Sequence, residues 1–344
     1  MTYQREFAKR IKVGIVGAGS HGYRNILPVM NYLPVQIEAI CDPHEELGKI
    51  TAKQYGCTYY PNTPAMYDQA DIEAVFICVS PKLHPQLVIE ALDAGKHVWV
   101  EKPIATRADE VAEMIAHRKE QIAAVGLKKA FMPATEKTLE IVNSLKYTPL
   151  RSLLAVYHMT IPPNGRLILD TKDTPNWLRN GVHPLAFLMS VGGKVATVTT
   201  IGNASGHGLV ALQFANGVIG NLHLASGPQP NLESYGVYGD DWQLEIVNTR
   251  VTLQRGIPFD YRRTTNYAPP GEESGAIVWD TSNCLATLEN KALFTQGFYQ
   301  ETMYFCECVL NTRQPEKGTL EFTHEMMKVY EAGLLSGGKE ISIA

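Results

Sequence analysis

The 344-residue sequence predicts an α/β protein with two domains. Strand-like and helix-like segments alternate over the first 130 residues, and this alternation is typical of a doubly wound parallel sheet. After residue 131, strand-like segments with a period of two follow one another without helices between them, which indicates an antiparallel or mixed sheet. We therefore expect one domain over residues 1–130 and a second over residues 131–344.

In the first domain, residues 74–79 form a continuous apolar run, as expected of a strand buried on both faces. Pro28 predicts a kink or an early end in the first helix. Gly95 follows the last residue of a helix, and Thr106 with Asp109 resembles a capping box. The remaining expected strands are 11–16, 36–41, 97–100 and 123–126. One helix is expected to begin at residue 22, and two others are expected at 44–55 and 84–94.

In the second domain, Asn216-Gly217 separates two strand patterns and predicts a hairpin turn. Residues 255–280 are rich in proline, glycine and charge, so we expect a mobile excursion there. The other expected elements are helices at 134–145, 293–311 and 324–336, and strands at 153–159, 195–201, 209–214, 218–224 and 340–343.

Composition excludes several classes of protein. The formal charge of −4 argues against a nucleic-acid partner, which usually requires a basic excess on one face. We expect no membrane span, because no apolar run reaches the required length, and the N-terminus lacks the apolar region of a signal peptide. Six scattered cysteines fit a reducing cytoplasm, and the single close pair, Cys306 and Cys308, lacks further ligands for a metal site.

The segment from Gly17 to Gly22 has the spacing of a dinucleotide-binding loop. Gly17 permits the turn from strand to helix, Gly19 lets the backbone approach a pyrophosphate, and Gly22 lets the helix pack closely on the strand. The diphosphate would lie against free N–H groups at the helix start. The residues expected to bind it are Gly17, Ala18, Gly19, Ser20, His21 and Gly22.

Asp42 ends the second predicted strand and indicates which cofactor binds. A carboxylate there can accept hydrogen bonds from both ribose hydroxyls of NAD and would repel the 2′-phosphate of NADP. No arginine follows Asp42, since the next residues are Pro43 and His44. NAD is therefore favoured over NADP, although a simple turn at the strand end is the alternative interpretation of Asp42.

Beyond these motifs, the chain resembles the Gfo/Idh/MocA oxidoreductases, the family of glucose-fructose oxidoreductase and inositol dehydrogenase. The matching segments run through the whole chain. They are the glycine loop, Asp42-Pro43, 80–84, 94–98, Glu101-Lys102-Pro103, 125–126, 131–133, 180–183 and 325–343.

The resemblance implies a Rossmann domain, then an α/β domain with a large, open, mostly antiparallel sheet, with the substrate between the two. It implies a homodimer or homotetramer formed through the outer face of that sheet. It further implies that Ser80, Pro81 and His84 lie along the cofactor, that Glu101 and Lys102 flank the nicotinamide, and that the Lys102-Pro103 peptide is cis.

The chemistry expected from the resemblance is oxidation of a hydroxyl group. His183 matches the family histidine that exchanges the proton, and Lys102 would stabilise the developing alkoxide. The family usually has an aspartate four residues before this histidine, and here Arg179 stands at that position. A second common aspartate, three residues after the histidine, is replaced by Ala186.

Arg179 leaves several interpretations open. It can bind an acidic group of the substrate through two parallel hydrogen bonds. Alternatively, the reaction relies on Lys102 and His183 alone, or turnover is lost and the protein only binds its ligand, or the match is displaced by one helical turn. His183 itself can also be a packed histidine before Pro184.

Further polar residues are candidates for lining the substrate site. Trp177 can stack on a sugar face, although a tryptophan at a helix start is more often a packing anchor. The complete substrate-binding set is Lys102, Tyr157, Arg166, Trp177, Arg179, Asn180 and His183, with His158 and Asn164 as neighbours.

The sequence therefore favours an NAD(P)-dependent oxidoreductase that transfers hydride between nicotinamide and a hydroxyl of a sugar, a polyol or a sugar derivative. Two alternatives stay open. The protein can be a non-catalytic sensor of nucleotide or sugar, as Arg179 suggests, or an NAD-dependent glycosidase that oxidises, eliminates and re-reduces its substrate.

Overall fold

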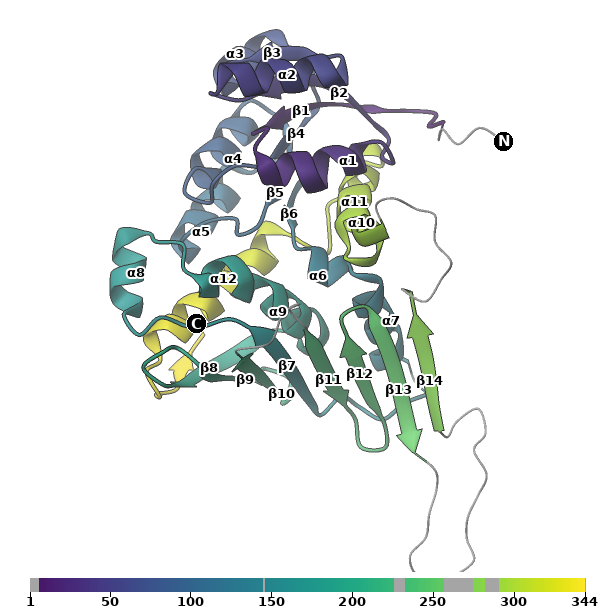
Figure 1. Ribbon diagram of the computed structural model, residues 1–344, viewed down its shortest axis with the longest axis vertical. Helices are drawn as coiled ribbons and strands as arrows, with labels where there is room; N and C mark the ends of the chain where they lie inside the picture. The colour runs from purple at the N-terminus through teal and green to yellow at the C-terminus, as the bar shows by residue number, and fades with distance from the viewer. Residues whose placement is uncertain (1–5, 145, 226–232, 257–274, 282–290, 344) are drawn as a thin grey trace, which may run out of the picture. The chain divides into compact units, whose positions relative to one another are not determined.

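The computed structural model describes residues 6–144, 146–225, 233–256, 275–281 and 291–343 (Figure 1). The chain divides into two compact units. Unit 1 comprises Met1–Phe131, Leu167–Thr174 and Ala292–Lys328, and unit 2 comprises Met132–Arg166, Pro175–Lys291 and Val329–Ala344. The first segment of unit 1 ends close to the predicted boundary, but the chain also returns to unit 1 twice.

Unit 1 contains a parallel sheet whose strand order is β3-β2-β1-β4-β5-β6. The order reverses between β1 and β4, so the doubly wound parallel sheet is confirmed. At this kind of reversal, ligands bind outside the carboxyl ends of the strands. The described strands are β1 (Ile11–Val16), β2 (Val35–Cys41), β3 (Thr58–Tyr60), β4 (Ala74–Ile77), β5 (His97–Glu101) and β6 (Ala123–Gly126).

The helix after β1 is irregular because of Pro28. A π-helical turn, η1 (Gly22–Ile26), precedes the proline, and α1 (Leu27–Met30) then contains it. Proline has no N–H to donate to the regular hydrogen bonds of an α-helix, so the turn before Pro28 is irregular. Of the two expected outcomes, the structure shows the irregular turn and not an early end of the helix. The other described helices that lie wholly in unit 1 are α2 (Glu45–Tyr55), α3 (Thr63–Gln69), α4 (His84–Asp93), α5 (Ala108–His117), α6 (Lys128–Phe131) and α11 (Phe298–Leu310).

The core of unit 1 joins the sheet to α11, although α11 lies far away in the sequence. Phe76 in β4 packs edge-on against Phe305 of α11, with ring centroids 5.5 Å apart. Trp99 of β5 contacts the other side of Phe76, also at 5.5 Å. Every residue of β4 is buried, as the continuous apolar run predicted.

Unit 2 contains a mixed, mostly antiparallel sheet, in the order β14-β13-β12-β11-β7-β10-β9-β8-β15 among the described residues. Only β7 and β10 pair in parallel. The large sheet implied by the resemblance is confirmed. Its strands are β7 (Ser152–His158), β8 (Val195–Gly202), β9 (Gly208–Phe214), β10 (Ile219–Ala225), β11 (Ser234–Tyr238), β12 (Gln243–Val247), β13 (Arg250–Gly256), β14 (Gly275–Asp280) and β15 (Ile341–Ser342).

Helices α7 (Pro133–Val142) and α9 (Asn176–Gly192) belong to unit 2 and pack against each other, and α9 also packs on β7 and β10 (Figure 1). Three further described helices, α8 (Gly165–Thr171), α10 (Lys291–Thr295) and α12 (Leu320–Leu335), have residues in both units. In the part of the chain that the structure describes, no helix combines the length and apolar character needed to cross a membrane.

Three local expectations need correction. The capping box uses Glu110 rather than Asp109, because the Glu110 carboxylate accepts from the backbone N–H groups of Thr106 and Arg107. The helix expected at 293–311 is two helices, divided at Gly297, which has φ of +96°. Part of the expected excursion is strand β14, paired with β13, while 257–274 lie outside the described residues.

Candidate functional site

The glycine loop between β1 and η1 depends on two glycines for its shape. Gly17 has φ of +93°, and a Cβ on it would lie 2.5 Å from the carbonyl oxygen of Cys78. A Cβ on Gly22 would lie 3.0 Å from the carbonyl oxygen of Gly17 and 3.3 Å from the Cβ of Cys78. The expected turn at Gly17 and the expected close packing at Gly22 are both confirmed.

Gly19 faces open space. No heavy atom lies within 4 Å of a Cβ built on it, in contrast to Gly17 and Gly22. Ser20 and His21 follow as exposed residues at the helix start. The first N–H groups of a helix lack intrahelical acceptors and attract anions. The loop therefore fits the diphosphate of a dinucleotide.

Asp42 braces this loop. Its side chain is only 7% exposed, and its Oδ2 accepts a hydrogen bond from the N–H of Ala18 at 2.8 Å. Its Oδ1 accepts from the N–H of His44, also at 2.8 Å. Each carboxylate oxygen of Asp42 can accept a second hydrogen bond, so both oxygens remain able to bind the ribose hydroxyls of a cofactor.

The turn after β4 includes Ser80, Pro81 and His84. The N–H of His84 donates to the carbonyl of Pro81 at 3.3 Å, and Ser80 is exposed. The ring of His84 is fully buried, and its Nδ1 donates to the carbonyl of Pro103 at 2.9 Å. Burial lowers the pKa of His84, so the ring is neutral. The expectation that His84 contacts the cofactor is wrong, because its ring joins two loops inside the protein.

Glu101 connects the glycine loop to the residues at the end of β5. Its Oε1 lies 2.9 Å from Nε2 of His21, and its Oε2 accepts from the N–H of Lys102 at 2.9 Å. The Lys102-Pro103 peptide is cis, as expected. Lys102 is half-buried, and the structure records no hydrogen bond from its ammonium group to another described residue. This ammonium group can therefore act on a ligand.

A second buried carboxyl group, Glu301 of α11, lies near Glu101. Glu301 is 2% exposed, and neither of its carboxyl oxygens has a hydrogen-bond partner among the described residues. Burial, followed by repulsion from Glu101, raises its pKa well above the ordinary value, against the opposing charges of Lys128 and Lys102. Glu301 is therefore a neutral acid in the folded protein.

In unit 2, α9 carries most of the candidate substrate residues. Arg179 and Asn180 lie four and three residues before His183, so each is a neighbour of His183 on the helix surface. His183 is buried, and its ring centroid lies 6.4 Å from that of Tyr157, at the end of β7. Burial and the charge of Glu233 raise the pKa of Tyr157, which keeps its hydroxyl protonated. Tyr157 and His183 are thus brought together.

Two arginines of the candidate set are exposed. Arg179 lies one helical turn before His183, and no hydrogen bond or ion pair is recorded from its guanidinium group to any described residue. Arg166 lies in the first turn of α8, and the structure gives no contact between it and His183 within the described ranges. Arg179 can therefore bind an anion beside His183, while Arg166 is not joined to this group.

Trp177 is a packing residue. It is 0% exposed, and its indole N–H donates to the carbonyl of Tyr330 at 3.0 Å. A Cβ on Gly181 would lie 2.5 Å from its ring. No face of the indole is free, so the expectation that Trp177 stacks on a sugar is wrong.

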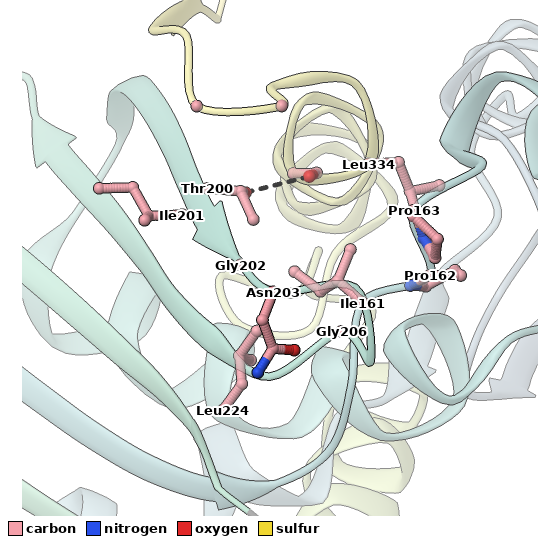
Figure 2. Close-up of a pocket in the computed structure, with 13 residues that line it drawn as sticks. Ile161, Pro162, Pro163, Thr200, Ile201, Gly202, Asn203, Gly206, Leu224 and Leu334 are labelled. Atoms are coloured by element: carbon pink, nitrogen blue, oxygen red, sulfur yellow. Dashed lines mark hydrogen bonds between the residues drawn. The ribbon is translucent and has the colours of Figure 1, made fainter.

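A pocket of about 280 Å³ lies elsewhere in unit 2 (Figure 2). The hydroxyl of Thr200, a buried residue of its lining, already donates to the carbonyl of Gly333 at 3.0 Å. No candidate catalytic or binding residue lines this pocket, so we assign it no function. Its lining is Ile161, Pro162, Pro163, Thr200, Ile201, Gly202, Asn203, Gly206, Leu224, Gly333, Leu334, Gly337 and Gly338.

Metal and thiol chemistry find no support in the described ranges. No group of three or more histidine, cysteine or acidic side chains there is arranged to hold a metal ion. Burial raises the pKa of Cys306 and Cys308, so both are protonated thiols. Cys284 lies outside the described residues.

Sequence reasoning did not identify Glu233 or Glu301. Glu301 shares a helix face with Phe298 and Phe305, and this pattern was available in the sequence as a signal of a buried acid. Glu233 precedes β11, and its position near Tyr157 and Tyr235 depends on how the strands pair. The sequence does not reveal this pairing.

The chain is similar to known oxidoreductases. Residues 11–128 match the family model of an oxidoreductase family with an NAD-binding Rossmann fold, GFO_IDH_MocA. The chain is 26% identical to the uncharacterized oxidoreductase YrbE of Bacillus subtilis (strain 168), over 70% of this chain and 72% of that protein. It is 27% identical to dTDP-3,4-didehydro-2,6-dideoxy-alpha-D-glucose 3-reductase of Streptomyces violaceoruber, over 46% of this chain and 47% of the reductase.

Among solved structures, a dehydrogenase from Chromobacterium violaceum superimposes with a TM-score of 0.80 at 19% identity. The match covers 96% of both chains. At this level of identity the match shows that the fold is shared along almost the whole chain.

Proposed function

Because the chain belongs to the Gfo/Idh/MocA family of oxidoreductases, we propose that it transfers hydride between a nicotinamide and a hydroxyl-bearing carbon of a sugar, polyol or sugar derivative. The observation that carries this proposal is the contact between His21 and Glu101. It joins the glycine loop to the segment that contains Lys102. A cofactor along the loop would thus end near this lysine.

We further propose NAD rather than NADP as the cofactor. Asp42 supports this choice, because its buried carboxylate lies at the end of β2 and would repel a 2′-phosphate. Gly17 to Gly22, Asp42, Ser80 and Pro81 would hold the cofactor, and Glu101 and Lys102 would flank its reactive ring. The bound nicotinamide accepts or supplies the hydride.

The roles of the protein side chains follow from their chemistry. Lys102 stabilises the alkoxide that develops when a hydroxyl loses its proton. His183 exchanges this proton, and Tyr157 donates a hydrogen bond to a substrate oxygen. Asn180 adds a further polar contact. The exposed guanidinium of Arg179 favours a substrate with a carboxylate or phosphate group.

The test measures nicotinamide reduction with NAD and with NADP against sugars, sugar acids and cyclitols. Lys102→Met and His183→Asn should each lower kcat/KM by about 10²-fold or more, the usual contribution of a positioned acid or base. Lys119→Met, at an exposed position of unit 1, is the matched control and should keep full activity.

Two outcomes would contradict the proposal. If no compound reacts although both cofactors are tested and NAD binds, the protein is a binding protein without turnover. If Lys102→Met keeps the activity of the unmodified protein, the role of this lysine is wrong. Release of an aglycone from aryl glycosides without net NADH would instead identify a glycosidase.

We also propose that the chain assembles as a homodimer or homotetramer through the sheet of unit 2. Four apolar side chains on different strands of this sheet are exposed, and their burial against a second copy of the chain would favour association. Sedimentation equilibrium measures the assembly mass directly, and a monomer would contradict the proposal. These side chains are Ile201, Ile219, Val247 and Val278.

A further inference from the structure

The ring of His21 makes a hydrogen bond at each of its two nitrogens. Nδ1 lies 3.2 Å from the amide nitrogen of Asn25, four residues later in η1, and Nε2 lies 2.9 Å from Oε1 of Glu101. An amide nitrogen can only donate, so Nδ1 accepts and the ring proton is on Nε2. The Nε2–H group therefore donates to Glu101, and Asn25 fixes both the tautomer and the orientation of the ring.

An aromatic contact also holds this ring, although 46% of the His21 side chain is exposed. The ring centroid of Phe298, the first residue of α11, lies 6.3 Å from that of His21. Phe298 is itself held, because Nζ of Lys128 lies 4.4 Å from its ring centroid and donates to Oε1 of Gln296 at 2.9 Å. Three segments of unit 1 thus restrain one side chain of the glycine loop: η1, the end of β5 and the start of α11.

Glu101 extends this restraint to Lys102. The residue is 4% exposed, and its two carboxyl oxygens have different partners. Oε1 accepts from His21, and Oε2 accepts from the backbone N–H of Lys102 at 2.9 Å. A carboxyl group bonded at both oxygens cannot rotate without breaking one of the bonds. Loss of the His21 bond takes this partner from an oxygen of a buried group, which favours reorientation of the group away from Lys102.

We propose that His21 is a positioning residue for Lys102, which acts through the carboxyl group of Glu101. The inference rests on the proposed function, because Lys102 is the group assigned there to the developing alkoxide. The glycine loop then has two roles. Its backbone holds the diphosphate, and its His21 side chain fixes the main chain from which the reactive lysine extends. A side chain without a hydrogen-bond donor at position 21 cannot perform the second role.

Two substitutions at position 21 separate the hydrogen bond from the size of the side chain. Glutamine and methionine are similar in length and volume, but only glutamine has a nitrogen that can donate to Glu101. His21→Gln should therefore keep the restraint, and His21→Met should lose it. Tyr23→Phe is the matched control, because the hydroxyl of Tyr23, in the same turn, donates to Oε1 of Gln54 at 3.1 Å.

The first test does not depend on turnover. NMR of the isotope-labelled protein measures how fast the backbone N–H of Lys102 exchanges with solvent. His21→Met should raise this rate by about 5-fold or more, the factor expected from the loss of one hydrogen bond. His21→Gln and Tyr23→Phe should exchange like the unmodified protein. Equal rates in His21→Met and the unmodified protein would overturn the inference.

The second test measures kcat, KM and the affinity for NAD, with the substrate found for the unmodified protein. His21→Met should lower kcat by about 10-fold or more, since a group displaced by about 1 Å can cost about 100-fold. His21→Gln should recover most of this loss, and Tyr23→Phe should keep full kcat. Calorimetric titration should find NAD affinity nearly unchanged in His21→Met, because the backbone of the loop is retained.

Three results of the second test would decide against the inference or the function. Unchanged kcat in His21→Met, or an equal loss in His21→Gln, would overturn the inference while the proposed function stands. A loss confined to NAD affinity would make His21 a ligand of the cofactor and would also overturn it. If the unmodified protein turns nothing over, the proposed function fails, and the exchange rate at Lys102 still decides whether His21 holds this segment.

Discussion

At the scale of single residues, the protonation of Glu301 should affect the stability of the fold. Its carboxyl group is buried without partners, and its pKa is raised well above 4.5. The unfolded chain loses this proton near pH 4.5, whereas the folded protein keeps it to higher pH. Above that pH the folded state binds more protons than the unfolded state, so the free energy of unfolding falls as pH rises.

We therefore expect Glu301→Gln to remove this loss of stability. Urea unfolding between mildly acid and mildly alkaline pH should show a smaller decrease for the variant. The difference between the two proteins should approach roughly 1.4 kcal/mol for each pH unit, the value for one proton. Glu307→Gln, exposed on the same helix, should behave like the unmodified protein. Parallel pH profiles for Glu301→Gln and the unmodified protein would show that Glu301 is ionised in the folded state.

Residues whose role is set by the local backbone were predictable, and residues whose role is set by packing were not. Gly17 needs its positive φ because the chain turns sharply after β1, and the spacing of the glycines already indicates this turn. His84 and Trp177 were assigned to ligands because their side chains are able to bind them. Their burial against Pro103 and Tyr330 depends on contacts that no local pattern reveals.

At the scale of elements, two glycines of one loop should respond differently to the same substitution. Gly17→Ala forces a positive φ on alanine and brings its Cβ to 2.5 Å from a backbone oxygen, so it should destabilise the fold by about 2 kcal/mol or more. Gly19→Ala places its Cβ in open space and should fold normally. If the diphosphate occupies that space, Gly19→Ala should instead weaken NAD binding by about 10-fold or more, since 1.4 kcal/mol of lost contact suffices for tenfold.

Calorimetric titration with NAD and urea unfolding separate the two effects. Each variant serves as the control for the other, because both add one methyl group to the same loop. Full NAD affinity in a folded Gly19→Ala variant would place the diphosphate away from this glycine.

Elements with strong internal patterns were predicted well, whereas the four strands β11 to β14, which form one end of the sheet, were not. The apolar run of β4 and the Asn216-Gly217 turn are local signals, and Gly217 has the expected positive φ of +88°. Strand β14 was missed because its residues are half-buried or exposed and it follows a segment rich in proline and glycine. Its strand conformation comes from pairing with β13, which lies outside the segment itself.

At the scale of the whole molecule, the sequence indicated two domains but not which segments form them. A single boundary near residue 130 is the simplest division of a chain whose pattern changes there. The structure assigns Ala292–Lys328 to unit 1 because α11 contributes Phe305 and Cys306 to the core under the parallel sheet. Nothing in the sequence pattern of α11 indicates that it packs on the parallel sheet of unit 1 rather than on the sheet of unit 2. Only the folded structure therefore reveals that residues 292–328 belong to unit 1.

This return predicts that residues 1–131 do not fold alone. Burial of a large apolar side chain contributes about 1.5–3 kcal/mol, so loss of Leu293, Phe298 and Phe305 removes about 5–9 kcal/mol. That loss is comparable to the entire stability of a typical domain, about 5–15 kcal/mol. A fragment of residues 1–131 should lack a cooperative thermal transition. The same fragment joined to residues 292–328 by a flexible linker should regain the transition, together with NAD binding. The assignment of α11 to this core would be wrong if both fragments unfolded cooperatively at the same temperature.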